Sequence, residues 1–317
     1  MIILSLFDGI SCWRVAFQRA GIPVEKYFAS EIDQYAIKIS QKNFPDTIHI
    51  WDITKISYQY MNGSKKDRGN WLLWEPSSWL EDTMWKLEKI DMVIGGSPCQ
   101  NLSRAGDKKW FQWDKSILFW EFVRLLREIK PKYFLFENVA SMSKENLHTI
   151  LQEFQKIFPK IYVHMIDSLD FVPQKRRRYY FTNFPFEKPK SKSKNLFEIF
   201  EENQIWENIP EDFLKKNPKI QQYSNTLWVY TLPRGFFRGS FNVVCPTITS
   251  SSWKHNNFLI KKENGEIFWR KFTPIECERL QTLPDNYTAW LSNSQRYRVI
   301  GNSWTVDVIA HILSFLK

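Results

Sequence analysis

A cysteine follows a short apolar run and two glycines in the segment Gly95–Gln100, which reads Gly-Gly-Ser-Pro-Cys-Gln. The apolar run 92–94 predicts a buried strand, and residues that directly follow such a strand lie at the edge of the sheet. A lone cysteine is more often a small buried side chain. The polar, glycine-rich surroundings of Cys99 instead favour a thiolate nucleophile in a cleft.

Two further segments place polar groups where they could act with this cysteine. The apolar run 133–136 ends in Glu137, and a carboxyl group at the same sheet edge would supply a proton donor beside Cys99. Farther along the chain, Arg176 and Arg178 alternate, so they share one face of an extended segment and suit phosphate or carbonyl contacts. A solvated basic run is the alternative interpretation of these arginines.

Acidic residues follow the first three expected strands. Asp8 and Gly9 lie in the first turn between a strand and a helix, and Glu31 and Asp52 come after the second and third strands. In open α/β sheets, ligands bind at the carboxyl ends of the strands. Glu31 there can accept both ribose hydroxyls of an adenosine, and Asp52 can accept from an adenine amino group. Each acid alone could be merely solvated, but three in register favour a nucleoside-binding edge.

The elements that position these residues alternate between short apolar runs and helical patterns up to about residue 182. Strands are expected at 1–7, 27–30, 48–51, 91–94 and 133–136, and helices at 13–20, 35–43 and 117–129. This alternation predicts parallel βαβ units in a doubly wound α/β fold. A hairpin of 161–166 and 178–181 is expected at the sheet edge. Helices are expected again at 273–280, capped by Thr273 with Pro274 at its first position, and at 305–316.

Two segments interrupt the alternation. Residues 55–89 are polar and carry four tryptophans (Trp71, Trp74, Trp79 and Trp85), which predicts an insertion that packs its own aromatic side chains. Residues 186–268 begin with a run rich in lysine, proline and serine and predict a smaller second domain. The large domain is then expected to comprise 1–185 and 269–317, with the C-terminal helix returning to it.

The composition limits the class of protein. The 317 residues include 44 Lys+Arg and 34 Asp+Glu, a formal net charge of +10, which suits a nucleic-acid partner or simply solubility. Aromatic residues make up 16% of the chain, which argues against disorder. No apolar run approaches the roughly 18 residues of a membrane span, so we expect a soluble, intracellular protein without membrane contact. The four cysteines are far apart, so neither disulfides nor a metal site are predicted.

In combination and in this order, the motifs resemble those of the cytosine-5 DNA methyltransferases. The similar segments are Phe7–Ile10, Glu31, Asp52–Ile53, Ser97–Gln100, Leu118, Glu137–Val139, Gln174–Arg178, Arg270–Pro284 and Gly301–Ser303. Their wording is closest to the animal de novo branch and its phage-like relatives. The resemblance implies a Rossmann-like S-adenosylmethionine-dependent methyltransferase fold in which 186–268 is the target-recognition domain.

The resemblance also implies a mechanism. Cys99 would add to carbon 6 of a cytosine flipped out of duplex DNA, so that carbon 5 can take the methyl group of S-adenosylmethionine. Glu137 would protonate ring N3, and Asn138 would fix that carboxyl group or the loop. Arg178 would hold the base carbonyl, and Arg176 a neighbouring phosphate or the loop.

The family's other functional positions can be transferred residue by residue. The implied cofactor contacts are Phe7, Asp8, Gly9, Ile10, Glu31, Ile32, Asp52, Ile53, Pro98, Leu118, Asn302 and Ser303. The implied DNA contacts are Gln100, Ser103, Lys108, Lys109, Arg234, Arg238, Thr247, Thr249 and Lys254. The expected partner is double-stranded DNA, bound by a monomer in the cytoplasm, or in the nucleus of a eukaryote. A companion restriction endonuclease stays an open question.

One position departs from the family pattern. Relatives usually have a glycine where Trp13 stands, so the indole is expected either to point away or to fill part of the cofactor pocket. Two alternative functions stay open: a catalytically impaired, methyltransferase-like DNA-binding or regulatory protein, and an RNA cytosine-5 methyltransferase of the same fold. A thiol hydrolase lacks a suitably placed histidine.

Overall fold

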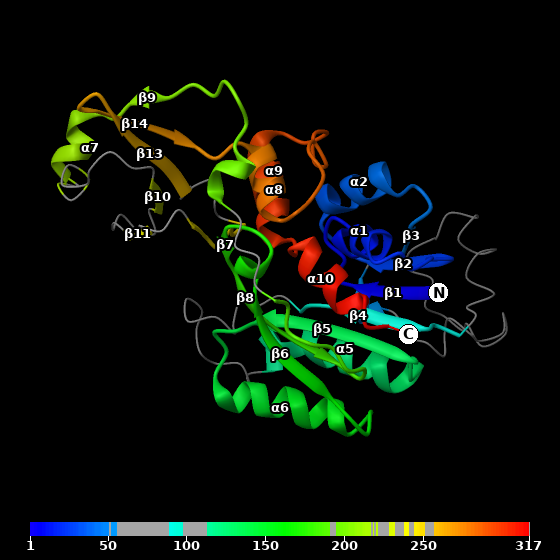
Figure 1. Ribbon diagram of the computed structural model, residues 1–317. Coiled ribbons are helices and arrows are strands. Elements are labelled where there is room, and N and C mark those ends of the chain that lie inside the picture. Colours follow the sequence, from blue (N-terminus) through cyan, green and yellow to red (C-terminus); the bar gives the residue numbers. More distant parts are fainter. Residues whose placement is uncertain are drawn as a thin grey trace.

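The computed structural model describes residues 1–50, 52–55, 89–97, 113–190, 195–216, 218, 220, 228–231, 238–240, 244–250 and 257–316. Within these ranges, only the backbone is described at 113–116, 228–231, 238–240 and 257. The described part contains a seven-stranded sheet of order β3-β2-β1-β4-β5-β8-β6 (Figure 1). Its strands are β1 (Ile2–Leu6), β2 (Lys26–Ser30), β3 (Ile48–His49), β4 (Met92–Gly95), β5 (Tyr133–Val139), β6 (Tyr162–Asp167) and β8 (Arg177–Thr182).

The sheet confirms the doubly wound α/β fold. Strands β1 to β5 pair in parallel, with β1 at the centre between β2 and β4. The expected hairpin is also present, because β8 pairs antiparallel with both β5 and β6. The second hairpin strand, β8, is the one that lies beside β5. This register sets Arg178 opposite Val139. Arg178 is therefore a diagonal neighbour of Glu137 on the same face of the sheet.

Helices cover both faces of the sheet (Figure 1). One face carries α1 (Cys12–Arg19), α2 (Gln34–Asn43) and α10 (Val306–Leu313), and the other carries α5 (Trp113–Ile129) and α6 (Lys144–Gln155). The α1 side is packed with aliphatic side chains around Trp13 and Phe17. The α5 side is dominated by phenylalanines, with Phe122, Phe136 and Phe154 in mutual ring contact. These two cores hold the sheet edge that carries the polar residues.

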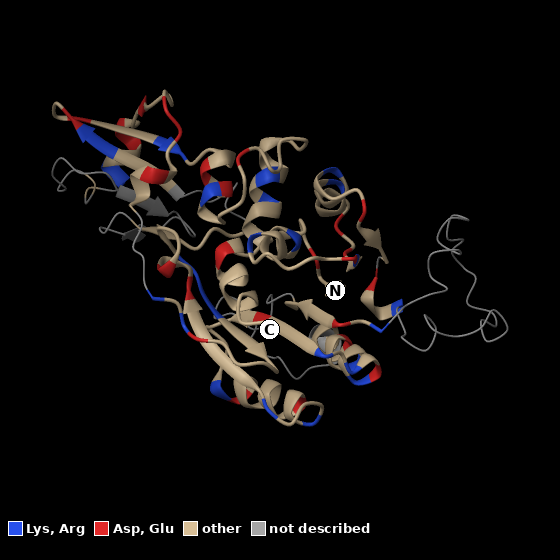
Figure 2. Cartoon of the chain, turned by 45° about the vertical axis from the view of Figure 1, so that its right-hand side comes forward, with Lys and Arg blue, Asp and Glu red and all other residues tan. Residues whose placement is uncertain are grey.

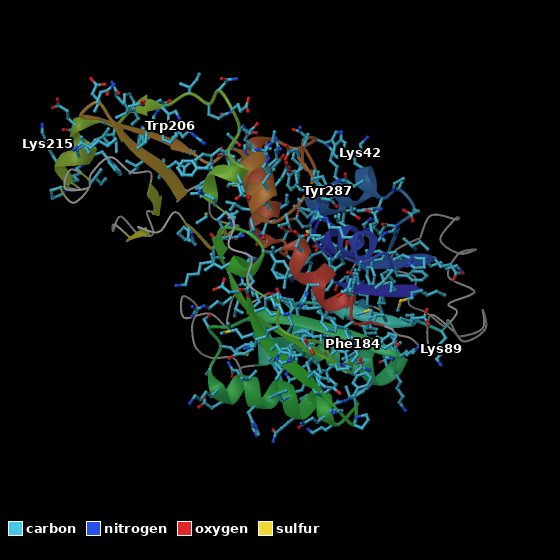
Figure 3. The ribbon with its side chains drawn as sticks, viewed as in Figure 1. Lys42, Lys89, Phe184, Trp206, Lys215 and Tyr287 are labelled. Atoms are coloured by element: carbon cyan, nitrogen blue, oxygen red, sulfur yellow. The ribbon has the colours of Figure 1, made fainter. Side chains whose placement is uncertain are left out.

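A second sheet, of order β11-β10-β13-β14-β9, lies beside the large one (Figure 1). Its elements are β9 (Glu207–Asn208), α7 (Glu211–Lys216), β10 (Trp228–Thr231), β11 (Arg238–Ser240), β13 (Asn257–Glu263) and β14 (Glu266–Lys271). Trp269 stacks on Phe258 with ring centroids 4.9 Å apart. Trp206, which Figure 3 labels, lies under the cations of Lys261 and Arg270. The sheet has a small core of its own, in which three isoleucines are buried and the rings of Phe258 and Trp269 pack against them (Ile209, Ile220 and Ile260).

The remaining elements join the two sheets. Strand β7 (Gln174–Lys175) pairs in parallel with β12 (Cys245–Pro246). Helix α8 (Pro274–Leu280) begins at the expected cap, because Thr273 and Glu276 form a reciprocal capping box with Pro274 in the first turn. Helix α9 (Asn293–Asn302) follows it. Short 3₁₀ turns occur at Ile53–Lys55, Ser168–Asp170 and Leu196–Ile199.

The remaining observations concern the expected insertion and membrane-spanning helices. Residues 56–88 of the expected insertion lie outside the described residues. Among the helices that the structure describes, none is long and apolar enough to cross a membrane.

Candidate active site

A cavity of about 380 Å³ opens at the carboxyl ends of the parallel strands. Its volume is that of a pocket for a small-molecule ligand. The predicted site residues that line it are Phe7, Gly9, Glu31, Ile32, Asp52, Ile53, Leu118, Glu137, Asn138, Arg176, Arg178, Thr249 and Asn302. The other lining residues are Ser30, Gly96, Ser97, Val139, Ile248, Ser250, Gly301 and Trp304. The structure thus brings together residues up to almost 300 positions apart in the chain.

The turn after β1 forms one wall of the cavity. Phe7, Gly9 and Ser11 all have a positive φ near 60°, a conformation that glycine adopts most readily. This alternation turns Asp8 inward, where it is buried. Asp8 and Ile10 are therefore not part of the cavity lining among the described residues, although the sequence suggested them as cofactor contacts.

The Asp8 carboxylate instead ties the turn to the sheet. Its Oδ1 accepts hydrogen bonds from the hydroxyls of Ser5 and Tyr27, and its Oδ2 accepts one from Ser11, all at 2.6 Å. Burial raises the pKa of Asp8 above its usual range, while the three hydroxyls act to lower it. Asp8 is a structural anchor beneath the cavity wall.

Glu31 lies in the cavity and is held by backbone donors. Its Oε2 accepts from the amide of Gly9, and its Oε1 accepts from the amides of Ile32 and Asp33, each at 2.8 Å. Burial raises the pKa of Glu31, and the three amides partly offset this rise. Next to it, Ile32 is 72% exposed at the cavity. A fixed carboxylate beside an exposed apolar side chain suits a nucleoside.

Asp52 occupies the equivalent place after β3. Its Oδ1 accepts from the backbone amide and the hydroxyl of Thr54, both at 2.9 Å. The following 3₁₀ turn, Ile53–Lys55, buries the side chain of Ile53. Leu118 of α5 also faces the cavity. The first three strands thus end in a wall of two carboxylates and apolar side chains.

Glu137, at the end of β5, lies between two partners on the other side of the cavity. Arg178 pairs with it, with 2.8 Å between the arginine Nε and the Glu137 Oε1. The indole Nε1 of Trp304 donates a hydrogen bond to Oε2, also over 2.8 Å. Both contacts are nearly excluded from solvent, since Glu137 and Trp304 are buried. The carboxyl group is therefore fixed in one orientation.

Asn138 connects Glu137 to the segment that leads to Cys99. Its Nδ2 donates to the hydroxyl of Ser97 at 3.2 Å and, less closely, to the Ser97 carbonyl. Its Oδ1 accepts from the amide of Val139 at 2.8 Å. Of the two roles expected for Asn138, these contacts match the fixing of the loop.

Arg176 is buried and makes contacts within the protein. Its Nη1 donates to the carbonyl of Ile248 at 2.9 Å, and its Nη2 donates to the carbonyl of Ser303 at 2.6 Å. Gln174 adds a bond from the amide of Ile248 to its own Oε1. These contacts are with neither the phosphate nor the nucleophile loop that were expected as its partners, and the residues of that loop from 98 to 112 lie outside the described ones. Arg176 joins the segment 244–250 to the end of α9.

The other predicted residues of these two segments also make internal contacts. The Thr247 hydroxyl donates to the carbonyl of Lys175 at 2.6 Å. A Cβ on Gly301 would lie 2.2 Å from the carbonyl atoms of Thr249, so only glycine permits this approach. The buried hydroxyl of Ser303 donates to the carbonyl of Ile300. Thr249 and Asn302 line the cavity, whereas Thr247 and Ser303 are absent from its described lining.

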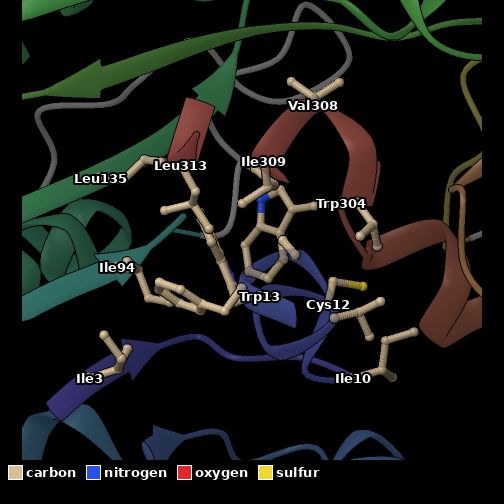
Figure 4. Packing of buried hydrophobic residues seen from close by; sticks show 14 of the residues in the cluster. Ile3, Ile10, Cys12, Trp13, Ile94, Leu135, Trp304, Val308, Ile309 and Leu313 are labelled. Carbon is tan, nitrogen blue, oxygen red and sulfur yellow. The ribbon is translucent and has the colours of Figure 1, made fainter. Parts of the chain in front are cut away.

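Trp13 is fully buried in the core and is not among the described residues that line the cavity. Figure 4 shows it among the side chains of β1, β4 and α10. Its ring lies 4.9 Å from that of Trp304, centroid to centroid. Of the two orientations expected from the sequence, the indole points away from the cavity.

The described cysteines are unsuited to nucleophilic chemistry. Cys12, Cys245 and Cys277 are all buried. Burial raises the pKa of Cys12 to about 12 and that of Cys277 well above its usual range. Of the four cysteines, Cys99 is the one that follows the cavity wall, at Ser97.

Several predicted residues cannot be placed. Pro98, Cys99, Gln100, Ser103, Lys108, Lys109, Arg234 and Lys254 lie outside the described residues. Arg238 begins strand β11, of which the backbone alone is described. Conversely, the sequence did not single out Trp304 or Ile248. The motif Gly301–Ser303 immediately before Trp304 was the one available signal for the former.

Comparison with known proteins decides the family. The family model described as C-5 cytosine-specific DNA methylase matches residues 1–317. The chain belongs to this family. DNA cytosine-5 methylation, with S-adenosylmethionine as methyl donor, is the activity that this membership brings.

Individual relatives are similar to this chain over nearly its whole length. The Type II methyltransferase M.NlaX of Neisseria lactamica is 29% identical over 99% of this chain and 96% of its own length. M1.ScrFI of Lactococcus lactis, also a Type II methyltransferase, is 30% identical over 97% of this chain and 75% of its own. The Dnmt2 methyltransferase of S. pombe shares the fold, with a TM-score of 0.67 at 18% identity over 99% of this chain and 97% of that one.

Proposed function

We propose that this methyltransferase acts on a cytosine flipped out of duplex DNA and forms a covalent adduct through Cys99. The observation that carries the proposal is the Glu137 carboxyl group, fixed between Arg178 and Trp304 in the same cavity as Glu31. A proton donor and an adenosine-binding acid then share one pocket. Ser97, two positions before Cys99 in the sequence, also lines that pocket.

The cavity residues fit S-adenosylmethionine, which supplies an electrophilic methyl group. The Glu31 carboxylate, held by three amides, would accept the two ribose hydroxyls. Asp52 would accept from the adenine amino group, and Ile32 and Leu118 would contact the apolar faces of the base. Phe7 and Gly9 would border the rest of the molecule.

The chain's own residues would then carry out four linked events. The Cys99 thiolate forms a bond to carbon 6 of cytosine, and the electrons of the double bond move toward carbon 5. Glu137 gives a proton to N3, which makes this addition easier, and Arg178 holds the base carbonyl. Carbon 5 would take the methyl group as its bond to the sulfonium sulfur breaks, which leaves S-adenosylhomocysteine. Water would accept the carbon-5 proton, N3 would return its proton to Glu137, and the double bond would form again as the Cys99 thiolate leaves.

Duplex recognition falls to the second sheet and to the loops around it. A base inside a duplex is out of reach, so the enzyme must extrude it. We propose that 186–268 forms a target-recognition domain in which Arg234, Arg238, Thr247, Thr249 and Lys254 contact DNA. The DNA at the flipped base would be contacted by Gln100 and Ser103, and its phosphates by Lys108 and Lys109. Basic residues lie on β13 and β14 (Figure 2). Of these, the exposed Lys271 supports this role, whereas Arg270 is buried and pairs with Glu276.

Methyl transfer from labelled S-adenosylmethionine to duplex DNA and to RNA tests the proposal. We expect transfer to DNA by the native protein, as a monomer, and none by Cys99→Ser. A duplex that contains 5-fluorocytosine, which cannot lose a proton from carbon 5, should trap the native protein covalently and leave Cys99→Ser free. Transfer to RNA alone would replace DNA as the substrate. No transfer to either polymer would overturn the proposal.

The names of the relatives also suggest a biological role. Type II methyltransferases are the modifying partners of restriction systems, and M.NlaX matches this chain over nearly its whole length. We propose that the protein marks a short DNA site against a companion endonuclease. Bisulfite sequencing of DNA from expressing cells would give that site. Methylation without any site preference would contradict this role.

A further inference from the structure

Trp304 contributes a polar contact to the active site as well as a buried ring. Its Nε1–H donates to the Oε2 of Glu137 at 2.8 Å, across 167 positions of sequence. Arg178 approaches the other oxygen, Oε1, at the same distance. The indole thus makes the hydrogen bond to the carboxyl group, and Arg178 contributes an ion pair, since Oε1 has no hydrogen-bond partner among the described residues.

Neighbouring residues also restrain the positions of Trp304 and Glu137. A Cβ on Gly96 would lie 2.8 Å from the Oε2 of Glu137 and 3.2 Å from the Trp304 ring, so glycine is required for the two side chains to meet beside β4. On the opposite side, Trp13 packs against the Trp304 ring. The indole is thereby held on a rigid core and aimed at one oxygen.

This contact changes what Arg178 can do. A guanidinium is a planar fork that readily binds both oxygens of a carboxylate. Because Trp304 occupies Oε2, Glu137 pairs with Arg178 through Oε1. A carboxyl oxygen has two lone pairs, so Oε2 can accept from the indole and still present its second position to a base.

We propose that Trp304 is a positioning residue that keeps the Glu137 carboxyl group turned toward the cytosine ring and out of a bidentate pair with Arg178. The inference rests on the proposed function, because it gives Glu137 the role of proton donor. It adds a residue outside the proposed set of catalytic groups. It also gives a reason for the contact between the two indole rings, because Trp13 supports the Trp304 ring that lines the cavity.

The test replaces the indole by a ring without a donor. We expect Trp304→Phe to lower kcat for methyl transfer about 10- to 100-fold, with KM for DNA and for S-adenosylmethionine within about threefold of native. In a Glu137→Gln background, measured by single turnover, the same change should lower the rate less than about threefold further. Residues that act through one group are non-additive in this way.

Trp13→Phe is the matched control, because it removes the same atoms from the same ring pair. Among the described residues, the Trp13 Nε1 has no hydrogen-bond partner, so this change alters packing alone. We expect a similar loss in melting temperature but a decrease in kcat below about threefold. If Trp13→Phe and Trp304→Phe lower kcat equally, or if the Trp304 and Glu137 effects multiply, packing alone explains Trp304.

A spectroscopic measurement separates this inference from the proposed function. In native protein labelled with ¹⁵N, Trp304→Phe identifies the indole resonance by removing it. At a fixed pH, that resonance should move in Glu137→Gln, because the acceptor of the indole N–H changes from a carboxyl group to an amide. If the native protein methylates nothing, the proposed function fails and this resonance decides the inference. A resonance that Glu137→Gln leaves unchanged would overturn it.

Discussion

The two sides of the cavity are built in different ways. On the cofactor side, the carboxylates of Glu31 and Asp52 are held by backbone and side-chain groups within a few residues, apart from the amide of Gly9. On the base side, Glu137 and Arg176 are held by groups that are distant in sequence, from Ile248 to Trp304. One side is made by local turns and the other by the closure of the whole fold.

The difference separates binding from chemistry. The carboxylates of the cofactor side are held by local turns, and the C-terminal segment supports those turns from outside: Tyr287 donates to the carbonyl of Ile10, and Arg298 pairs with Asp33. The base side exists only when 244–250 and 301–304 return to the sheet. Changes on the two sides should therefore have separable effects on cofactor affinity, on turnover and on stability.

The largest effect is expected for Glu137→Gln. The amide keeps the shape of the side chain but cannot give a proton to N3, so we expect kcat to fall about 10²- to 10⁴-fold. The cofactor dissociation constant, measured by calorimetry without DNA, should stay within about threefold. A large loss of cofactor affinity in this variant would break the division into two sides.

Arg176→Ala tests whether the base side depends on closure of the fold. It leaves the buried carbonyls of Ile248 and Ser303 without a charged donor, so we expect the free energy of unfolding to fall by about 3 kcal/mol. Arg177→Ala is the control: its side chain is 56% exposed and pairs only at the surface with Asp167. Its cost should be below about 1 kcal/mol. Equal losses in urea unfolding would contradict the structural role of Arg176.

The same contrast explains what the sequence could predict. Local pattern located the strand ends, the acids Glu31, Asp52 and Glu137, and the alternating Arg176 and Arg178. Family resemblance added the role of each residue. Trp304 was missed because a single tryptophan between Ser303 and Thr305 carries no periodic pattern that shows which way its ring faces. Its contact with Glu137 depends on where α9 ends and α10 begins, which no local pattern specifies.

Asp8 shows the converse case. Family resemblance implied a cofactor contact for Asp8, but its side chain is buried and is not among the described residues that line the cavity. Alternating positive φ values at Phe7, Gly9 and Ser11 turn it inward. The hydroxyls of Ser5 and Tyr27 then complete its burial. Phe7 and Ser11 adopt a positive φ although they are not glycine, and this backbone conformation sets the direction of the Asp8 side chain.

Glu31→Gln tests the cofactor side by itself. We expect S-adenosylmethionine affinity to fall about 10- to 100-fold, because a carboxylate that accepts two ribose hydroxyls makes charge-assisted hydrogen bonds. Glu25→Gln, at an exposed position outside the cavity, should change nothing. With saturating cofactor, kcat of Glu31→Gln should stay within about threefold of native. A fall in kcat that matches that of Glu137→Gln would contradict the separation.

The native protein should also show a pH dependence that this variant lacks. Burial raises the pKa of Glu31, and only the ionised form accepts from both hydroxyls. Cofactor affinity should therefore increase as pH rises through that raised pKa and level off above it. The dependence should disappear in Glu31→Gln. Parallel pH profiles for the two proteins would assign the titration to another group.

The smallest effect is expected for Tyr27→Phe, which removes one donor from Asp8. Burial raises the pKa of Asp8, so on acidification the folded protein binds a proton at a higher pH than the unfolded chain does. The contribution of Asp8 to stability is therefore greatest below the unfolded pKa and falls as pH rises through the folded pKa. The Tyr27 hydroxyl opposes this fall by stabilising the ionised carboxylate. Tyr27→Phe should thus cost about 2 kcal/mol above the Asp8 pKa and about 1 kcal/mol below it. The exposed Tyr35→Phe is the control in thermal unfolding, and a cost for Tyr27→Phe that is the same at every pH would show that Asp8 is not the group through which Tyr27 acts.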